Sequence, residues 1–178
     1  MKEKVDVFSV APQILRDLST GILVTTKADG RVNTMTIGWG TLGIEWGKPI
    51  FTIYIRQGRF THAQLEKNPE FTVNIPDGDF NRAILGKAGT TSGWNMDKIK
   101  DLGLHLEAPE AISVPGIKEL PLTLECRVLY KVDQALKDMP KKAVDAFYPQ
   151  DVDSTNCGAN RDIHTAYYAE IMGAYRIK

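Results

Sequence analysis

Hydrophobic and polar residues alternate along much of this chain, and such alternation is typical of strands that bury one face of a sheet. Other stretches have the spacing or the capping residues of short helices. We expect strands at residues 21–26, 32–40, 50–56, 70–75, 122–132 and 163–177. We expect helical turns at residues 12–19, 61–68, 79–86, 94–102 and 140–148.

Two local motifs indicate a turn and a helix start. Asp29-Gly30 stands between the first two apolar runs and predicts a tight antiparallel hairpin, because glycine tolerates the positive φ that such a turn needs. Thr61 and Gln64 have the spacing of a capping box, in which each side chain bonds a free amide of the first helical turn. Residues 87–93 are expected to form a loop. Residues 151–161 could cover a site, but we interpret them as a surface loop.

The predicted elements favour a mainly β fold with short helical excursions. Many strands joined by hairpins are typical of a closed or nearly closed antiparallel barrel. A β-sandwich is the alternative, and a doubly wound parallel sheet is disfavoured because strands and helices do not alternate regularly. The sequence contains no repeat, low-complexity tract or long linker, so we expect a single domain over residues 1–178.

Charge and composition narrow the classes of partner. The 178 residues include 22 Lys and Arg and 22 Asp and Glu, so the formal net charge is zero. A broad nucleic-acid or membrane surface needs excess positive charge, so neither partner is expected. Charges interrupt the apolar residues at the N-terminus, and no apolar run is long enough for a membrane span, so we expect a cytoplasmic protein. Two cysteines, Cys126 and Cys157, predict neither a metal site nor a disulfide framework.

The predicted strand at residues 32–40 carries small and polar side chains where a packed strand would carry large ones. Glycine inside a strand often marks the close approach of a ligand, although a bulge or a barrel corner explains it equally well. One face of this strand, formed by Thr34, Thr36, Gly38 and Gly40, is small and hydroxylated. Such a face suits a flat ring that lies against the backbone.

A basic pair follows the next strand. Arg56 and Arg59 stand at its end, just before the predicted helix start at Thr61 and His62. A helix start offers free amides and a partial positive charge, so an anion there would meet amides, hydroxyls and guanidinium groups together. A solvated strand end explains the arginines if they are considered alone. Next to the small-residue strand, they favour a site for a flat anionic ligand.

No catalytic side chain is expected. The sequence lacks a nucleophile elbow, a phosphate loop and a His-Glu-x-x-His zinc motif, so redox chemistry would need a bound cofactor. The histidines other than His62 are isolated and are not expected to act directly. Two carboxylates on strands, Glu125 and Glu170, are expected to pair with Arg127 or Arg176.

Several segments, taken in order, resemble the flavin reductase-like family, whose flavoredoxin-type members have an FMN-binding split barrel. These segments are residues 33–40 (NTMTIGWG), 56–62 (RQGRFTH) and 70–75 (EFTVNI). Residues 91–98 (TSGWNMDK) are similar to the family's Ser-Gly-x-x-x-x-Lys segment. Residues 167–171 (YYAEI) take the place of its final strand, with Ala169 where glycine is common. The resemblance covers about residues 15–175.

The resemblance implies an antiparallel, Greek-key-type split barrel that binds FMN, commonly as a homodimer with FMN at or near the interface. The flavin would lie along Asn33, Met35, Thr36, Ile37, Gly38, Trp39, Gly40 and Thr41, with Thr36 toward the phosphate. Its phosphate would meet Arg56, Arg59, Thr61 and His62, and further contacts would come from Ser92, Gly93 and Lys98. Either Trp39 or Trp94 would stack on or wall the ring.

The implied activity is hydride transfer from NADH or NADPH to the flavin, followed by electron delivery to a small-molecule or protein acceptor. The protein would hold, orient and tune the flavin, and no side chain would need to act as an acid or base. A non-catalytic split barrel that binds flavin, haem or another planar ligand is the alternative. The sequence specifies neither the acceptor nor the preferred nicotinamide nucleotide.

Overall fold

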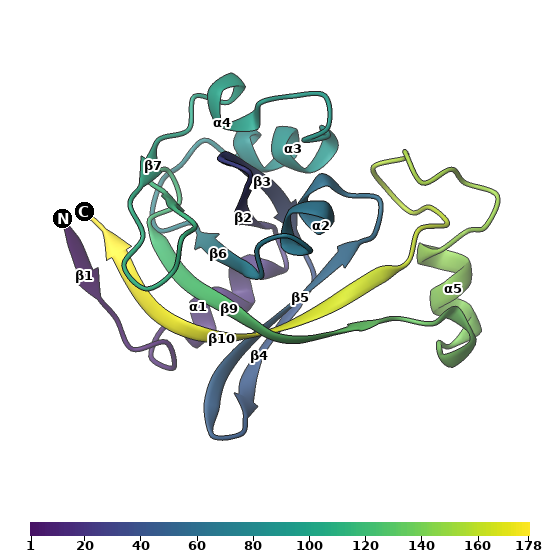
Figure 1. Cartoon of the computed structure of the whole chain (residues 1–178), viewed down its shortest axis with the longest axis horizontal. Helices are drawn as coiled ribbons and strands as arrows, with labels where there is room; N and C mark the ends of the chain where they lie inside the picture. The colour runs from purple at the N-terminus through teal and green to yellow at the C-terminus, as the bar shows by residue number, and fades with distance from the viewer.

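Alternating apolar positions give this chain ten strands, and the computed structural model describes residues 1–178 (Figure 1). The strands are β1 Lys2–Lys4, β2 Ile22–Ala28, β3 Arg31–Ile37, β4 Gly40–Glu45, β5 Lys48–Arg56, β6 Glu70–Ile75, β7 Leu106–Glu107, β8 Gly116–Ile117, β9 Leu122–Asp133 and β10 His164–Ile177. The helices are α1 Ala11–Leu18, α2 Phe60–Leu65, α3 Ala83–Thr90, α4 Lys98–Asp101 and α5 Lys141–Phe147, with a 3-10 turn at Leu136–Asp138.

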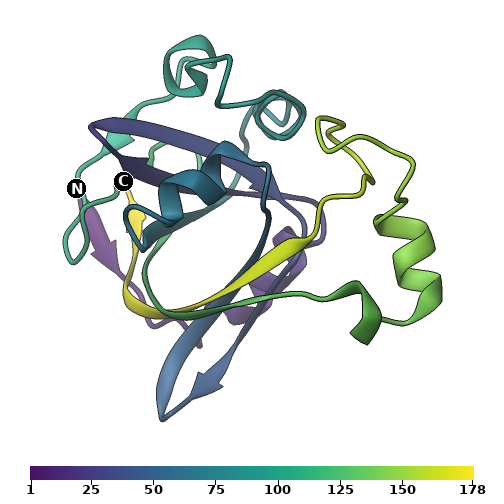
Figure 2. The same cartoon turned by 45° about the vertical axis from the view of Figure 1, so that its right-hand side comes forward.

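Eight strands form one antiparallel sheet that curls into a barrel (Figures 1 and 2). Its order is β3-β2-β6-β9-β10-β5-β4, with β1 paired to β10, while β7 and β8 form a separate ribbon. The two ends of the sheet, β3 and β4, follow each other in the chain but are not paired, so the barrel is open along this seam. The predicted mainly β, antiparallel split barrel is therefore confirmed.

Apolar side chains fill the barrel. Phe51, Phe71 and Tyr167 are the largest of a cluster of 20 buried residues drawn from most of the strands and from α1. Ile14 and Leu18 on the buried face of α1 belong to this cluster, so the helix packs against the barrel. Each fully buried apolar side chain contributes about 1.5–3 kcal/mol, so this cluster is the main source of stability.

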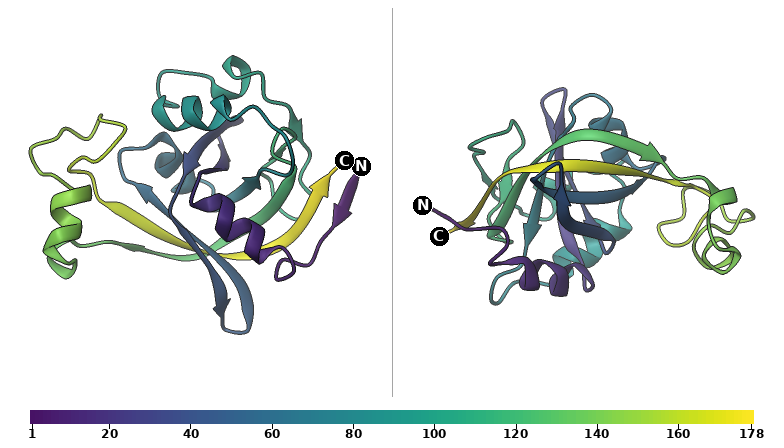
Figure 3. Two further views of the ribbon diagram at one scale, coloured as in Figure 1. Left: turned by 180° about the vertical axis from the view of Figure 1, so that it is seen from behind. Right: turned by 90° about the horizontal axis from the view of Figure 1, so that it is seen from below.

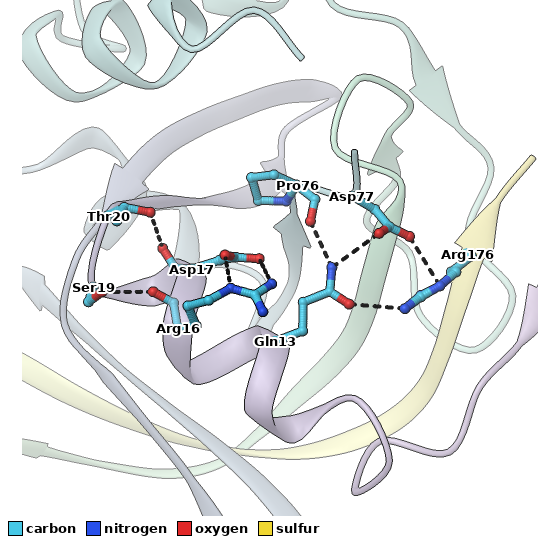
Figure 4. Close-up of polar contacts among 8 residues, drawn as sticks. All are labelled: Gln13, Arg16, Asp17, Ser19, Thr20, Pro76, Asp77 and Arg176. Carbon is cyan, nitrogen blue, oxygen red and sulfur yellow. Dashed lines mark hydrogen bonds and ion pairs between the residues drawn. The ribbon is translucent and has the colours of Figure 1, made fainter. Parts of the chain in front are cut away.

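A polar junction fastens α1 to two strand ends (Figure 4). The Gln13 amide nitrogen donates to the Pro76 carbonyl at 2.9 Å, just after β6. Its amide oxygen accepts from Arg176 in β10 at 3.0 Å. Arg176 also forms an ion pair with Asp77 at 3.1 Å. One glutamine thus links the helix to both strand ends.

The predicted Asp29-Gly30 hairpin is confirmed, but the next strand was wrongly extended to residue 40. β2 and β3 are joined by a two-residue turn in which Asp29 and Gly30 have φ of 50° and 76°. β3 ends at Ile37, and residues 40–45 pair with β5 as the separate strand β4. Gly40 makes this pairing possible, because a Cβ there would lie 3.0 Å from the Thr52 carbonyl oxygen.

The predicted capping box is wrong. Helix α2 begins at Phe60, and no side chain caps it. Thr61 instead accepts a hydrogen bond from Asn33 Nδ2 at 3.1 Å. Gln64 bonds Thr26 and the Arg31 carbonyl at 2.6 and 2.8 Å. Both side chains form hydrogen bonds with buried polar groups of β2 and β3. These long-range hydrogen bonds replace the local cap.

Helices α3 and α4 begin later than predicted, so most of the expected loop at residues 87–93 is the end of α3. This segment packs outside β2 and β3, over a second apolar cluster that includes Leu23 and Ile117. The other predicted elements lie within a few residues of their expected positions.

Both carboxylate pairings were also wrong. Glu125 is fully buried and accepts backbone amide hydrogen bonds from Glu110 and Ala111 at 2.8 and 2.6 Å. Glu170 pairs with Lys48 at 2.6 Å. A strand pattern shows which face a carboxylate occupies but not which neighbouring segment reaches it.

Residues 134–163 form an excursion between β9 and β10 that projects away from the barrel and carries α5 (Figures 1 and 3). Helix α5 buries none of its residues. No helix of the structure combines the length and apolar character needed to cross a membrane.

Candidate functional site

A cleft of about 230 Å³ lies at the seam where β3 ends. The barrel side of its wall comes from β3 and the two residues after it, from β5, from one residue of α3, from Arg59 just before α2 and from His164 at the start of β10. The other side comes from the excursion 134–163. Its lining residues are Met35, Thr36, Ile37, Gly38, Trp39, Tyr54, Arg56, Arg59, Gly89, Phe147, Cys157, Gly158, Ala159 and His164.

The β3 wall includes five of the residues predicted to lie along a flat ring, Met35 to Trp39. The Thr36 hydroxyl cannot donate to a ligand, because Oγ1 donates its hydrogen to the Leu85 carbonyl at 2.6 Å. Gly89 of α3 approaches Thr36 so closely that a Cβ there would lie 3.3 Å from its Cβ. Thr36 therefore holds α3 against β3, and this side of the cleft is shaped by a tightly packed pair of elements.

Besides Asn33, two predicted wall residues lie outside this cleft. Gly40 borders a neighbouring hollow that shares Trp39 and Tyr54 with the cleft. Thr41 lies farther along β4 and is exposed. The break in pairing after Ile37 separates both residues from the β3 wall.

Of the two candidate tryptophans, Trp39 lines the cleft and Trp94 does not. Trp39 makes an edge contact with Phe147 of the excursion, with 5.1 Å between ring centroids. Trp94 packs against Phe60 at 4.8 Å and donates its indole N–H to the Gly58 carbonyl at 3.2 Å. The side chain of Trp39 is 41% exposed, so a ligand in the cleft would cover much of it.

A small polar recess adjoins the cleft and shares Met35, Arg59 and Gly89 with it. Seven of the predicted site residues, from β3, α2 and the segment around α4, meet here: Asn33, Met35, Arg59, Thr61, Ser92, Gly93 and Lys98. Gly93 is required by close packing, because a Cβ there would lie 2.5 Å from Asn33 Oδ1.

Two cations face this recess without a carboxylate partner. The Lys98 side chain is buried, and its ammonium donates to the Ala88 carbonyl at 2.7 Å. Burial, and then the nearby charge of Arg59, lower the pKa of Lys98 to about 8. Arg59 donates from one nitrogen to the carbonyls of Asn156 and Cys157, at 3.2 and 3.0 Å. The Asn33 Oδ1 atom is buried and has no hydrogen-bond partner.

Arg56 and His62 do not join the recess. Arg56 is buried and donates to three backbone carbonyls of the excursion, those of Phe147, Asn160 and Asp162. His62 Nε2 lies 3.2 Å from Thr165 Oγ1, on the β10 side of α2, and burial lowers the pKa of His62. The helix was predicted to begin at Thr61. It begins at Phe60, and in this helix His62 lies toward β10.

Sequence reasoning missed His164, Tyr54, Phe147 and the loop residues of the cleft. His164 is buried, and its Nδ1 lies 2.8 Å from the Tyr148 hydroxyl. Burial, followed by the charges of Arg56 and Arg59, lowers the pKa of His164 to about 3, so the imidazole is neutral. His164 pairs with Arg56 in the β5–β10 register, and recognising that pairing would have brought it to the site.

Residues 151–161 form the expected surface loop, and this loop also borders the cleft. Cys157 is exposed but lines the cleft with the two residues after it. Asn160 is fully buried and bonds the Asn156 and Gly158 carbonyls, at 2.6 and 3.2 Å, which folds the loop back on itself. The loop therefore forms one wall of the candidate site.

Comparison with solved structures shows the same fold. The structure matches flavoredoxin of Desulfovibrio vulgaris with a TM-score of 0.65 and 21% identity, over 89% of this chain and 69% of that one. It matches an FMN-binding domain of a flavin reductase-like enzyme from Shewanella baltica with a TM-score of 0.65 and 16% identity, over 99% and 77%.

Comparison of the sequence adds a relative and a family. An uncharacterized protein of Archaeoglobus fulgidus is 33% identical over 101 residues, which are 57% of this chain and 56% of that protein. The chain thus spans less than two thirds of the length of this relative. The model of the flavin reductase-like domain matches residues 15–173. This match covers most of the chain, and the chain therefore belongs to the flavin reductase-like domain family.

Proposed function

We propose that this protein binds FMN and acts as an NAD(P)H-dependent oxidoreductase. One observation carries the proposal: the recess with Arg59 and Lys98 adjoins a cleft lined by the run of residues 35–39 and by the aromatic side chains of Tyr54 and Phe147. A flat ring with an anionic tail is the ligand that such a pair of sites fits. The family match and the FMN-binding fold relatives support FMN as that ligand.

The charges and donors of the recess suit a phosphate group, and its volume of about 20 Å³ means that a phosphate would have to widen it toward the adjoining cleft. An ammonium has three donors, and Lys98 uses one of them on the Ala88 carbonyl. Two buried or half-buried cations side by side repel each other, and an anion between them would relieve that repulsion. The Asn33 amide nitrogen gives one of its two hydrogens to Thr61, so its second N–H could donate to the same anion. Thr61 and Ser92 would complete the polar lining.

The residues of the cleft fit the ring. Residues 35–39 offer an apolar and backbone surface, and Trp39 forms one edge of it. His164 would face the ring as a neutral imidazole, so it adds no charge to that part of the cleft. A flavin bound here supplies hydride transfer from a nicotinamide nucleotide and electron delivery to an acceptor. The protein contributes binding, orientation and exclusion of water.

We also propose a homodimer of this single-domain chain. Ile44 and Trp46 at the β4–β5 turn are both 70% exposed, and Leu129 and Val132 of β9 are exposed as well. Exposed apolar side chains of this kind mark interaction surfaces. A second copy of the chain would cover them. The molecular mass in solution tests this, and a monomeric mass would contradict it.

Flavin content and reduction test the proposed function. We expect protein produced with added FMN to be yellow, with an absorbance maximum near roughly 450 nm, and to release FMN on denaturation. We expect NADH or NADPH to bleach this absorbance without oxygen and an acceptor to restore it. Protein that binds FMN but is not bleached would be a non-catalytic binder. Protein that releases no flavin would contradict the proposal.

A further inference from the structure

The excursion 134–163 forms one wall of the cleft, and its aromatic contacts with the barrel are those of Phe147 with Trp39 and of the buried Tyr148 with His164. None of its residues belongs to either apolar cluster. Helix α5 buries none of its side chains, and the views of the fold show it standing away from the barrel (Figures 1 and 3). Beyond these two aromatic contacts, its position depends on polar contacts near the cleft.

Arg56 makes the central set of these contacts. One guanidinium nitrogen donates to the carbonyls of Asn160 and Asp162, and the other donates to the Phe147 carbonyl at 2.9 Å. These carbonyls come from both ends of the loop that follows α5. The guanidinium also lies over the Tyr148 ring, 5.0 Å from its centroid. A single side chain of β5 thus joins the end of α5 to the start of β10.

The surroundings of Arg56 suit this use of its charge. Arg56 is 8% exposed, and no carboxylate lies within ion-pair distance of its guanidinium. Carbonyl oxygens and an aromatic face compensate a buried guanidinium, because the planar group presents several donors in a fixed fork. A lysine has one nitrogen and could not reach all three carbonyls. Because Arg56 uses its donors on these carbonyls, the cations that face the recess are Arg59 and Lys98.

We propose that Arg56 is a positioning residue that fastens the excursion 134–163 to the barrel. It thereby places Phe147 and residues 157–159 as the outer wall of the cleft, beside the space that a nicotinamide nucleotide or electron acceptor would enter. The fastening stands on the contacts of this chain alone. The effect on a second substrate rests on the proposed function.

Hydrogen exchange of the flavin-free protein tests the fastening. Arg56→Gln should raise amide exchange in residues 149–162 at least about tenfold, the size expected for losing one hydrogen bond to a charged group. Exchange in β6 should not change. Arg161→Gln is the matched control, because Arg161 lies in the same segment, is exposed and pairs only with Asp153. Equal exchange in Arg56→Gln and Arg161→Gln would overturn the proposal.

Arg56→Lys keeps the experiment decisive if the glutamine variant does not fold. It retains the charge but not the fork, so exchange in residues 149–162 should still rise about tenfold. Protection equal to that of the parent protein would show that charge alone suffices and would overturn the positioning role.

Flavin titration separates positioning from phosphate binding. If Arg56 positions the wall, both Arg56 variants should change the dissociation constants of FMN and riboflavin by the same factor. If Arg56 instead bound the phosphate, its variants would bind FMN more weakly and riboflavin as before, and that result would contradict the proposal. With flavin bound, the KM for the nicotinamide nucleotide should rise about tenfold, with a smaller change in kcat. An unchanged KM would show that Arg56 does not affect the second substrate. Protein that binds no flavin would contradict the proposed function but would leave the hydrogen-exchange result standing.

Discussion

The barrel and the excursion 134–163 contribute opposite walls of one cleft, but different forces hold them. Phe51, Phe71 and Tyr167 are fully buried in the barrel, and α1 is fastened over them. The excursion meets the barrel mainly through polar contacts of Arg56, Arg59 and the Gly58 amide, which donates to Asp162 at 2.6 Å. Two aromatic contacts, Phe147 with Trp39 and Tyr148 with His164, add to them. A ring and its phosphate would thus rest on the rigid side, while the adjustable side faces the second substrate.

Truncating a side chain should lower the free energy of unfolding far more in the barrel than in the excursion. Phe71→Ala should lower the free energy of unfolding by about 3–5 kcal/mol, because it leaves a cavity in the barrel. Phe147→Ala, which removes a half-exposed ring of α5, should cost about 1 kcal/mol or less. Urea denaturation followed by circular dichroism measures both. Similar losses would show that the excursion is part of the cooperative core and that the same forces hold both regions.

Acid should weaken the junction of the two regions through His164. Its folded pKa of about 3 lies below the unfolded value near 6.5, so the unfolded chain binds more protons between these values. The contribution of neutral His164 to stability is therefore fully present above about pH 6.5 and is lost as the pH falls toward 3. Urea denaturation at several pH values measures this loss.

The variant His164→Gln serves as the control for this pH dependence. It cannot be protonated, so the free energy of unfolding should fall less steeply between pH 6.5 and 3 than in the parent protein. Parallel profiles would show that His164 does not supply the difference.

Much of the barrel could be predicted from the sequence, because local patterns determine it. The Asp29-Gly30 turn and the alternation in residues 122–132 involve neighbouring residues only. The capping box at Thr61 failed because Asn33, far away in the chain, bonds the same hydroxyl. The strand at residues 40–45 was missed because Gly43 and the turn at Trp46 weaken its pattern.

The candidate site was predictable where one segment supplies it and hidden where several segments meet. Residues 35–39 line the cleft as a run, and Lys98 and Arg59 meet in the recess. Arg56 was expected at the phosphate but serves carbonyls of a segment about a hundred residues later. His164 was missed because only the β5–β10 register brings it beside Arg56.

One titration series tests whether the recess of Arg59 and Lys98 holds the phosphate of FMN. FMN and riboflavin are titrated against the parent protein, Lys98→Met and the control Lys100→Met, which changes an exposed lysine of the same helix. FMN should bind the parent more tightly than riboflavin, and Lys98→Met should cost FMN about 1.5–3 kcal/mol while riboflavin and Lys100→Met are unaffected.

The same series repeated at several pH values should show FMN affinity falling as the pH rises above 8. The free Lys98 ammonium loses its proton there, whereas a bound phosphate would raise its pKa. These results together would confirm the recess as the phosphate site. Equal affinities of the parent for FMN and riboflavin, or an unchanged preference in Lys98→Met, would contradict the account.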